Sequence, residues 1–351
     1  NAGSYTVTVT VAANGNYAAA SSTATAFTIA NKSLTIIGLT GSNKVYDGTT
    51  SATVTGTAAV SGLVLSQTVT LGGTPTYTFA SANVGTAISI STTGYTISGT
   101  AAVNYTLTQP TLAANITAPT VTVTPTVGSY TYSGSAQGPN TATNTGTGTS
   151  YTYSYVGTGG TTYAASATRP TNAGSYTVTV TVAADGNYGS ASSSATAFSI
   201  ATKTLTIGSP TIASKVYNGS ATSGTVTLGS LSGLIGSETL SVTADGTYLN
   251  ANVGTGKTAT ITYTLVNGTG LASNYSLSSG SATGNITGAS LTVTASAQSK
   301  SYGSTAPTSG TLNTHFTVTG LLGTDVANGA TLAYSGTPAG NTATAAVGSY
   351  T

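Results

Sequence analysis

The chain carries the stretch NAGSYTVTVTVAADGNY at residues 172–188, in which polar and apolar residues alternate. Tyr176, Val178, Val180 and Val182 occupy every second position, and threonines stand between them. Successive side chains of a β-strand point to opposite faces of the sheet, so this order predicts a strand with one face against a hydrophobic core. The stretch therefore indicates a β fold and also indicates which residues of the strand are buried.

The same stretch occurs twice. Residues 1–36 match residues 172–207 at 29 of 36 positions, at an offset of 171 residues. Self-similarity at a fixed period is typical of a tandem array of structural units. Short strand patterns are bounded by Gly, Pro, Asn and Ser clusters about ten residues apart, which predicts a β-sandwich for each unit. Two further elements return at nearly the same spacing: KVYDGTT (44–50) as KVYNGSA (215–221), and ANVGT (82–86) as ANVGT (251–255).

The composition favours an all-β array and excludes several classes of partner. Charged residues make up 3% of the chain, apolar residues 38%, and there are 45 glycines and no cysteine. The net charge of +2 comes from scattered residues, so we expect no nucleic-acid partner. No disulfide framework is available. No apolar run approaches the ~20 residues that span a bilayer, so we expect no membrane insertion in this segment.

The repeats predict two alternating module types arranged like beads on a string, with a two-module period of about 171 residues. The first residues lack a signal-peptide pattern, so we interpret the chain as an internal or processed piece. The expected units are residues 1–31 (the C-terminal part of a first-type module), 32–117 (a second-type module), 118–201 (a first-type module), 202–287 (a second-type module) and 288–351 (the N-terminal part of a first-type module).

Both module types resemble known families. KVYDGTT, with the downstream segments ANVGT and NYTL, looks like the YDG domain, and the first type, with YSGSAQGP (132–139) near its start and NAGSYTVTV near its end, looks like the MBG domain. Both are Ig-like β-sandwich repeats of very long bacterial surface and secreted adhesins, including filamentous-haemagglutinin-like proteins. The resemblance implies an extracellular or cell-surface location. Asn218 stands where the YDG signature has Asp, so the carboxylate is not essential to that turn.

Turns and corners are the structural sites that the sequence predicts. Two NG or DG pairs between strands predict type I′ hairpin turns, because both central residues of that turn need a positive φ. The Gly-x-Tyr-x-Val pattern resembles the tyrosine corner of Ig-like sandwiches, in which a hydroxyl ties a loop to the next strand. The predicted residues are Asn14-Gly15 and Asp185-Gly186 for the hairpins, Asp47-Gly48 and Asn218-Gly219 for the KVY turns, and Tyr5 and Tyr176 for the corners.

Groups for catalysis or metal binding are scarce. His315 is the one histidine, and without cysteine a His/Cys metal site cannot be built. The acids lose their charge between copies: Asp47 matches Asn218, Asp185 matches Asn14, Glu238 matches Gln67, and Asp245 and Asp325 fall opposite neutral residues. A turn tolerates the exchange of Asp for Asn, whereas calcium coordination by paired carboxylates does not. We therefore expect no catalytic residue, no cofactor, no metal and no enzyme activity.

An intramolecular Lys–Asn isopeptide bond is a further possibility to weigh. The reaction requires a nearby buried acid to move protons, and no acid recurs beside the repeated lysines. We therefore predict exposed lysines and asparagines in turns. The recurring residues are Lys32, Lys44 and Asn115 in one copy and Lys203, Lys215 and Asn285 in the other.

Tyrosines at alternate positions leave a binding role open. Tyr151, Tyr153 and Tyr155 could contact a sugar, although tyrosines in such strands are more often core or cross-strand packing residues. A receptor site would be expected in a region without a repeat, and the segment 140–163 is the best candidate. The ligands expected for it are surface glycans or host proteins.

The chain begins at NAGSYT and stops at AVGSYT, at equivalent points of the first-type module. One interpretation is a window on a longer covalent array. The other is that copies join head to tail, with the C-terminal part of one completed by the strands of the next, as in donor-strand complementation. In either case the sequence predicts a non-enzymatic stalk or fibre of a bacterial adhesin or surface filament, whose partners are neighbouring modules or copies of itself.

Overall fold

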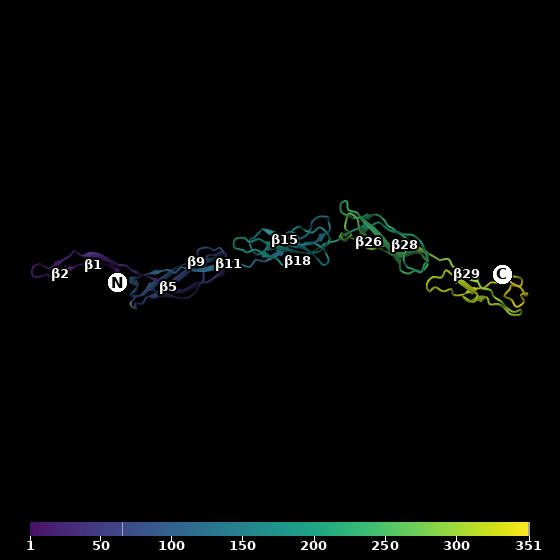
Figure 1. Cartoon of the computed structure of the whole chain (residues 1–351), viewed down its shortest axis with the longest axis horizontal. Helices are drawn as coiled ribbons and strands as arrows, with labels where there is room; N and C mark the ends of the chain where they lie inside the picture. Colours follow the sequence, from purple (N-terminus) through teal and green to yellow (C-terminus); the bar gives the residue numbers. More distant parts are fainter. Residues whose placement is uncertain (65, 350–351) are drawn as a thin grey trace.

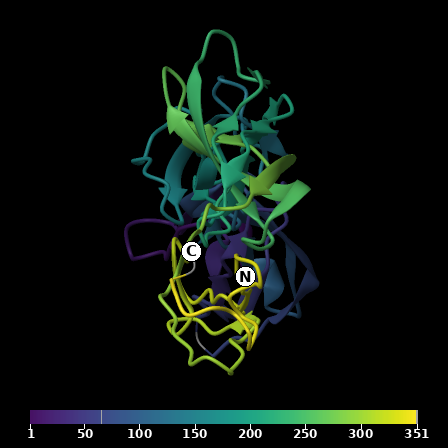
Figure 2. The ribbon, with the colours of Figure 1, turned by 90° about the vertical axis from the view of Figure 1, so that its right-hand side faces the viewer.

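The fold is all-β, as the sequence predicts. The computed structural model describes residues 1–64 and 66–349, and within them the chain forms strands and two short 3₁₀ turns but no α-helix. Figure 1 shows five parts following one another along a single long axis. Figure 2, viewed from the C-terminal end, shows residues 202–287 above residues 288–349, so the rod is not straight. We refer to residues 1–31 as the N-terminal segment, 32–117 as module I, 118–201 as module II, 202–287 as module III, and 288–349 as the C-terminal segment.

Module I consists of two sheets. One has the order β10-β5-β7 and the other β6-β11-β9-β8. The first two strands of the module lie in different sheets. β5 belongs to the three-stranded sheet, and β6 belongs to the four-stranded sheet, where it runs parallel to β11. The elements are β5 (Lys32–Gly41), β6 (Lys44–Val45), β7 (Val54–Ser61), β8 (Thr70–Phe79), β9 (Gly85–Ser98), η1 (Ala102–Asn104), β10 (Tyr105–Thr108) and β11 (Leu112–Thr117).

Module III repeats this plan with a more broken first sheet. Its four-stranded sheet, β22-β28-β26-β25, matches that of module I strand for strand, and short pairs replace the long β5–β7 ladder. Its elements are β19 (Lys203–Thr204), β20 (Thr206–Ile207), β21 (Thr211–Ile212), β22 (Lys215–Val216), β23 (Val226–Thr227), β24 (Leu231–Ser232), β25 (Leu240–Tyr248), β26 (Gly254–Asn267), η2 (Ala272–Asn274), β27 (Tyr275–Ser276) and β28 (Gly280–Thr287).

Module II contains the opening stretch as its central strand, β16. That strand pairs with β15, β17 and β18, and β13 runs parallel to β18 at the edge. A second sheet, β12-β14, packs over β16. Its elements are β12 (Val123–Pro125), β13 (Tyr130–Thr131), β14 (Ala142–Asn144), β15 (Tyr151–Thr158), β16 (Gly174–Val182), β17 (Ala191–Ser192) and β18 (Thr196–Ala201).

The two terminal segments are small. The N-terminal segment forms two antiparallel pairs, β1–β4 and β2–β3, and the C-terminal segment forms β29–β31 and β30–β32. Every strand pair among the described residues joins strands of the same part of the chain. The elements are β1 (Gly3–Val7), β2 (Thr10–Val11), β3 (Ala20–Ser21), β4 (Thr25–Ile29), β29 (Thr292–Ala295), β30 (Ser309–Gly310), β31 (Phe316–Thr319) and β32 (Ala330–Thr331).

The hydrophobic cores do not all stop at module boundaries. Modules I and III each have a small core of their own, around Ile90 and Ile261. The core of module II continues into module III, where it includes Leu205 and Tyr275. Modules II and III are therefore packed as one body, which follows from a shared hydrophobic cluster and not from strand pairing.

Candidate functional site: the junctions between modules

The junction between modules II and III is built on two tyrosines. Tyr132 of module II and Tyr275 of module III are about 5% exposed, and their rings meet edge to face with centroids 5.3 Å apart. The Tyr132 hydroxyl donates to Oε1 of Glu238 at 2.5 Å, and the Tyr275 hydroxyl donates to Oε2 at 2.6 Å. One carboxylate thus holds hydroxyls from both modules, and such charge-assisted bonds are stronger than neutral ones.

The same contacts set the acidity of these tyrosines. Burial, reinforced by the hydrogen bond to the Glu238 carboxylate, raises the pKa of Tyr132 to about 12. Burial raises the pKa of Tyr275 as well, and its bond to Glu238 acts in the same direction. Both side chains therefore stay neutral donors at physiological pH, as the bridge requires.

A buried asparagine forms the second contact of this junction. Asn274 is 1% exposed, and its Oδ1 accepts a hydrogen bond from the Ala173 backbone N–H at 2.8 Å. Its Nδ2 donates to Oδ1 of Asn172 at 3.1 Å. The Tyr176 hydroxyl donates to the Asn172 carbonyl oxygen at 2.8 Å and so holds this loop in place. The predicted corner residue therefore positions the loop that contacts module III.

The N-terminal segment meets module I through the same asparagine contact, and module I contains the counterpart of the Tyr275–Glu238 bond. The Ala2 N–H donates to Oδ1 of Asn104 at 2.8 Å, and the Tyr5 hydroxyl donates to the Asn1 carbonyl oxygen at 2.7 Å. The Tyr105 hydroxyl donates to Oε1 of Gln67 at 2.6 Å. Glutamine thus takes the place that glutamate has in module III, which shows that an amide oxygen serves as acceptor at this position.

The junction between modules I and II is formed by a hairpin tip. Oδ1 of Asn187 accepts a hydrogen bond from the Val84 backbone N–H at 2.7 Å, and its Nδ2 donates to Oδ1 of Asn83 at 3.2 Å. The ring of Tyr188 lies edge to face on Tyr46, with centroids 5.8 Å apart. The tip of module II thus reaches back onto the KVY and ANV loops of module I.

This tip differs from the type I′ turn that the sequence predicts. Asp185 pairs with Tyr188 through backbone hydrogen bonds of 2.8 and 2.9 Å, so the central residues are Gly186 and Asn187, not Asp185 and Gly186. Gly186 has a φ of +51°, whereas Asn187 does not have the positive φ that a type I′ turn requires. The prediction was wrong by one residue, because the pairing extends as far as Asp185.

The N-terminal tip shows the same shift. Asn14 pairs with Tyr17, and the backbone hydrogen bonds between them are both 3.0 Å. Gly15 and Asn16 are therefore the central residues, whereas the sequence predicts Asn14-Gly15. The shift places an asparagine at the outermost point of each tip, where Asn187 makes the contact with module I.

The KVYDG loop, which carries Tyr46, is closed by hydrogen bonds from Lys44. Lys44 Nζ donates to Oδ1 of Asp47 at 2.8 Å and to the Thr49 carbonyl oxygen at 2.6 Å. Gly48 has a φ of +77°, a backbone conformation that glycine adopts without strain. Hydrogen bonds, first from Lys44 and then from the Thr49 backbone N–H, lower the pKa of Asp47 to about 2.

Module III builds the same loop without the carboxylate. Lys215 Nζ donates to Oδ1 of Asn218 at 2.8 Å and to the Ser220 carbonyl oxygen at 2.7 Å. Asn218 Oδ1 also accepts from the Ser220 N–H at 3.1 Å, and Gly219 has a φ of +78°. The loop geometry therefore depends on an oxygen acceptor and a glycine, and not on the charge of Asp47.

The structure places the three candidate ligand-binding tyrosines against the core of module II. Tyr155 is 1% exposed and donates its hydroxyl hydrogen bond to the Pro139 carbonyl oxygen. Tyr153 stacks on it with centroids 6.3 Å apart, and the Tyr151 hydroxyl accepts from Nδ2 of Asn144. All three pack against the hydrophobic cluster from β15, the strand that pairs with β16. Burial removes Tyr155 from the candidate ligand contacts, whereas a ligand contact of the partly buried Tyr151 and Tyr153 stays a prediction.

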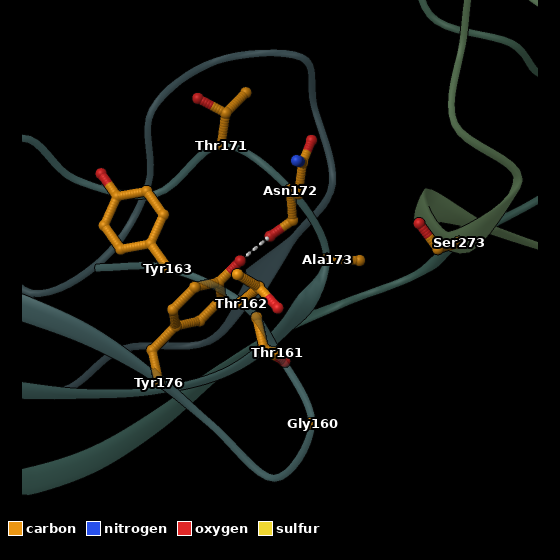
Figure 3. Close-up of a pocket in the computed structure, with 9 residues that line it drawn as sticks. All are labelled: Gly160, Thr161, Thr162, Tyr163, Thr171, Asn172, Ala173, Tyr176 and Ser273. Atoms are coloured by element: carbon orange, nitrogen blue, oxygen red, sulfur yellow. Dashed lines mark hydrogen bonds between the residues drawn. The ribbon is translucent and has the colours of Figure 1, made fainter.

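A polar recess lies beside the II–III junction (Figure 3). Its volume is about 390 Å³, and it is lined by Gly160–Tyr163, Thr171–Ala173, Tyr176 and Ser273. The rings of Tyr163 and Tyr176 meet edge to face, with centroids 5.8 Å apart. The lining carries hydroxyl and amide groups and no ionisable group other than these phenols. Part of the segment 140–163 therefore does reach a concave surface, although not through the tyrosines that the sequence singles out.

The remaining candidate groups make hydrogen bonds within their own part of the chain. Nδ1 of His315 accepts a hydrogen bond from the Thr311 N–H at 2.9 Å. The prediction that the recurring asparagines lie in turns is wrong, because Asn115 lies in β11 and Asn285 in β28. Oδ1 of Asn115 accepts from the Ala87 N–H at 2.8 Å, and Asn285 does the same with the Gly256 N–H. Among residues 1–64 and 66–349, no three His, Cys, Asp or Glu residues lie close enough together to hold a metal ion.

Sequence reasoning missed Tyr132, Asn187, Tyr188, Glu238 and Asn274, because their partners lie in another module. A signal was available in the repeats. The pair Asn104-Tyr105 returns as Asn274-Tyr275, and Gln67 returns as Glu238 with the same shape. Polar residues that recur with their shape preserved at module ends indicate a recurring contact.

Comparisons with known proteins agree with the repeat. Residues 30–112 and 201–283 match the model of the YDG domain. No curated protein matches the chain. Among solved structures, the Drosophila N-cadherin EC1-4 crystal structure aligns with 81% of this chain and 83% of its own, at 9% identity and a TM-score of 0.23, which carries no inference. No helix among the described residues has the length and apolar character needed to cross a membrane. The chain therefore contains two YDG-type segments, which begin 171 residues apart.

Proposed function

We propose that this chain is a structural repeat region of a bacterial adhesin or surface filament, located outside the cell and without enzyme activity. Its role would be to give reach and mechanical continuity between the parts that it joins. The two YDG-type segments and the linear arrangement of the modules support this proposal. The observation that carries it is the hydrophobic core that runs from module II into module III.

The shared hydrophobic core makes modules II and III one stiff unit. Bending at this junction would expose Leu205 and Tyr275, which are 2% and 4% exposed, and would separate Tyr132 from Glu238. Exposure of apolar surface costs free energy in proportion to its area, so the packed arrangement of the two modules is favoured over bent ones that open the junction. In repeat proteins, such contacts between neighbours determine shape and stiffness.

The test measures the shape of the full chain in solution by small-angle X-ray scattering and by electron microscopy of single molecules. The wild-type chain should be a rod whose II–III angle varies little. Tyr132→Ala combined with Glu238→Ala should broaden that angle while circular dichroism keeps its β signature. Glu238→Gln, which reproduces the Gln67 arrangement, is the matched control. Compact particles, or freely jointed wild-type modules, would contradict a stalk.

A binding role is the second candidate, and the recess beside the II–III junction favours it. A neutral lining of hydroxyl and amide groups around an aromatic ring suits an uncharged saccharide, because the ring packs on the apolar face of a sugar and the polar groups bind its hydroxyls. Glycan-array binding of the wild-type chain that is lost in Tyr163→Ala, but kept in Tyr334→Phe, would favour this role. An absence of glycan binding would leave the stalk as the proposal.

A further inference from the structure

The KVYNG loop of module III (residues 215–219) joins an asparagine to a glycine, at Asn218 and Gly219. In such a pair the backbone nitrogen of the glycine can attack the side-chain amide carbon of the asparagine, because glycine has no side chain to block the approach. In residues 1–64 and 66–349, Asn218 is the only asparagine of an Asn–Gly pair whose side-chain oxygen accepts a hydrogen bond from a lysine. The asparagines of the four such pairs are Asn14, Asn218, Asn267 and Asn328.

Lys215 holds the amide oxygen of Asn218. Its Nζ donates to Oδ1 of Asn218 at 2.8 Å, and to the carbonyl oxygens of Ser220 and Thr222 at 2.7 and 2.6 Å. Lys215 lies in β22, which pairs with β28 so that Lys215 is opposite Ile286. The ammonium group is therefore fixed in place by the strand and by its oxygen acceptors, and it points at the amide without further ordering.

The backbone of the loop completes the arrangement around the amide. The Ser220 N–H is a second donor to Oδ1 of Asn218, at 3.1 Å. This bond closes a ring of atoms that contains both the amide carbon and the Gly219 nitrogen, and so it keeps the two near each other. The Gly219 N–H donates to no other backbone group in the described part of the chain, and the space beside its Cα is open. The nucleophile is thus free, and the oxygen it would charge already has its donors.

Module I shows the same loop with an acid in place of the amide. Asp47 stands at the position of Asn218, and its Oδ1 accepts from Lys44 Nζ at 2.8 Å and from the Thr49 N–H at 2.9 Å. The Asp47 side chain is 54% exposed, so the second carboxylate oxygen, which takes the place of the amide nitrogen, is hydrated. An aspartate therefore fits this loop with the contacts that the asparagine makes.

We propose that Asn218 is a self-modification site, which the KVYNG loop converts to aspartate with Lys215 as the activating group. The Gly219 nitrogen attacks Cγ of Asn218 and its proton passes to water or hydroxide. The Cγ–Nδ2 bond then breaks, and Nδ2 takes a proton from the solvent and leaves as ammonia. The cyclic imide that results adds water at Cγ, the bond between Cγ and the Gly219 nitrogen breaks, and that nitrogen recovers a proton. The balance is water consumed and ammonia released, with no oxidation or reduction.

Lys215 promotes both steps at the same carbon. When Gly219 attacks, negative charge develops on Oδ1, and a charge-assisted hydrogen bond to an oxyanion is stronger than one to a neutral amide oxygen. The lysine therefore stabilises the transition state more than the ground state, which is the requirement for catalysis. In the second step it polarises the same carbonyl group, so water adds at Cγ and aspartate forms. Addition at the backbone carbonyl carbon would instead give isoaspartate.

The reaction would give module III the charged loop that module I has. Hydrogen bonds, first from Lys44 and then from the Thr49 N–H, lower the pKa of Asp47 to about 2, so this loop stabilises a carboxylate. Conversion of Asn218 replaces a hydrogen bond between a lysine and a neutral amide with an ion pair. A newly made chain and an aged chain would therefore differ in this loop. The inference goes beyond the proposed stalk and does not depend on it.

Peptide mapping of the full chain during incubation at neutral pH measures the conversion. Mass spectrometry distinguishes acid from amide, and chromatography separates aspartate from isoaspartate peptides. Asn267 is the internal control, because its Oδ1 accepts from the Ala272 N–H and the Gly268 N–H is bonded to the Gly270 carbonyl oxygen. Asn218 should convert at least about tenfold faster than Asn267, mainly to aspartate. In urea the two should react alike and give mainly isoaspartate.

Variants of the lysine test its role. Lys215→Met should slow the conversion of Asn218 more than about tenfold and raise the share of isoaspartate, whereas Lys215→Arg should restore most of the rate. Lys257→Met is the matched control, because Lys257 is another lysine of module III that donates to an asparagine, at Oδ1 of Asn250. It should leave the rate at Asn218 unchanged. Circular dichroism of each variant checks that the β structure is kept.

Asp47→Asn transfers the reaction to module I without touching module III. Lys44 and the Thr49 N–H already contact the Oδ1 position there, so the new amide should return to aspartate at a rate within about threefold of that at Asn218. Retention of the amide at both positions in the folded chain would overturn the proposal. A wild-type or faster rate in Lys215→Met would overturn it as well, because the lysine would then protect the amide. Neither result concerns the shape of the rod, so the stalk proposal is tested separately.

Discussion

The N-terminal segment and the second half of module II have almost the same sequence but opposite burial. Val9 is 62% exposed and its counterpart Val180 is fully buried; Phe27 is 47% exposed and Phe198 is 6%. The strand pairing is the same in both, since Tyr5 lies opposite Phe27 just as Tyr176 lies opposite Phe198. The comparison shows that the alternating pattern determines the ladder and the apolar face, whereas the cover comes from residues far away in the chain.

The largest expected difference in stability concerns the valines of this strand, which are Val178, Val180 and Val182 in module II and Val7, Val9 and Val11 in the N-terminal segment. Val180→Asp places an unpaired carboxylate in a closed core and should destabilise module II by about 4 kcal/mol or more. Val9→Asp should change the stability of the dilute monomer by less than about 0.5 kcal/mol, because the side chain is already in water. Urea denaturation followed by circular dichroism at low concentration measures both. Similar losses would mean that the N-terminal face is covered within the monomer.

Much of the fold could be predicted from the sequence. The alternation of polar and apolar residues depends on neighbouring positions alone, and the repeat can be read directly from the sequence. The pattern of residues 172–182 predicts β16 and its buried face, and the repeats predict where each part begins and ends. The break-up of the first sheet in module III could not be predicted from similarity to module I. There, Gly208 and Gly229 lie in close approach at the point where short pairs replace the β5–β7 ladder.

The junctions were harder to predict for a different reason. Their contacts join residues about a hundred positions apart, such as Tyr132 with Glu238 and Val84 with Asn187. No periodicity in either module alone indicates the partner. The hairpin tip was predicted one residue out of place, because pairing continued through Asp185 and left Asn187 at the outermost point.

The II–III junction gives the next largest effect. Tyr132→Phe keeps the ring packing and removes one hydrogen bond to a carboxylate, so it should cost about 1.5–3 kcal/mol. Glu238→Gln should cost less, since Gln67 accepts the equivalent bond from Tyr105. The unfolding free energy of the II–III body is the quantity to measure. A larger loss in Glu238→Gln than in Tyr132→Phe would show that the charge itself holds the junction.

Alkaline pH should destabilise the parts of the chain whose tyrosines are buried. Burial raises the pKa of Tyr132 and of Tyr155 from 10 to about 12, so the unfolded chain loses these protons first as the pH rises. The stabilising contribution is complete below pH 10 and declines as pH rises toward 12. Stability measured across this range should fall, and Tyr155→Phe should make the fall shallower. A constant stability up to pH 12 would contradict the raised pKa values of Tyr132 and Tyr155.

The two hairpin tips provide a smaller contrast. Tyr188→Ala removes an edge-to-face contact with Tyr46 and should weaken the I–II junction by about 1 kcal/mol. Tyr17→Ala alters a side chain that is 76% exposed and should leave the dilute monomer unchanged. Scattering curves that report the distribution of I–II angles would show broadening for the first variant. Broadening for both would place a contact at Tyr17 in the monomer.

The smallest effect compares the two KVY loops, which share a geometry but differ in charge. The pKa of Asp47 is lowered to about 2, so its contribution to loop stability is present above its ordinary pKa and is lost as the pH falls from about 4 through 2. In module III the neutral Asn218 makes the same contacts and has no such transition. Hydrogen exchange of the Thr49 amide should therefore quicken in acid relative to that of Ser220, after allowance for intrinsic rates, and Asp47→Asn should abolish the difference. If Ser220 quickened equally, acid would be acting on a feature that both loops share, and the Lys44–Asp47 pair would not be its cause.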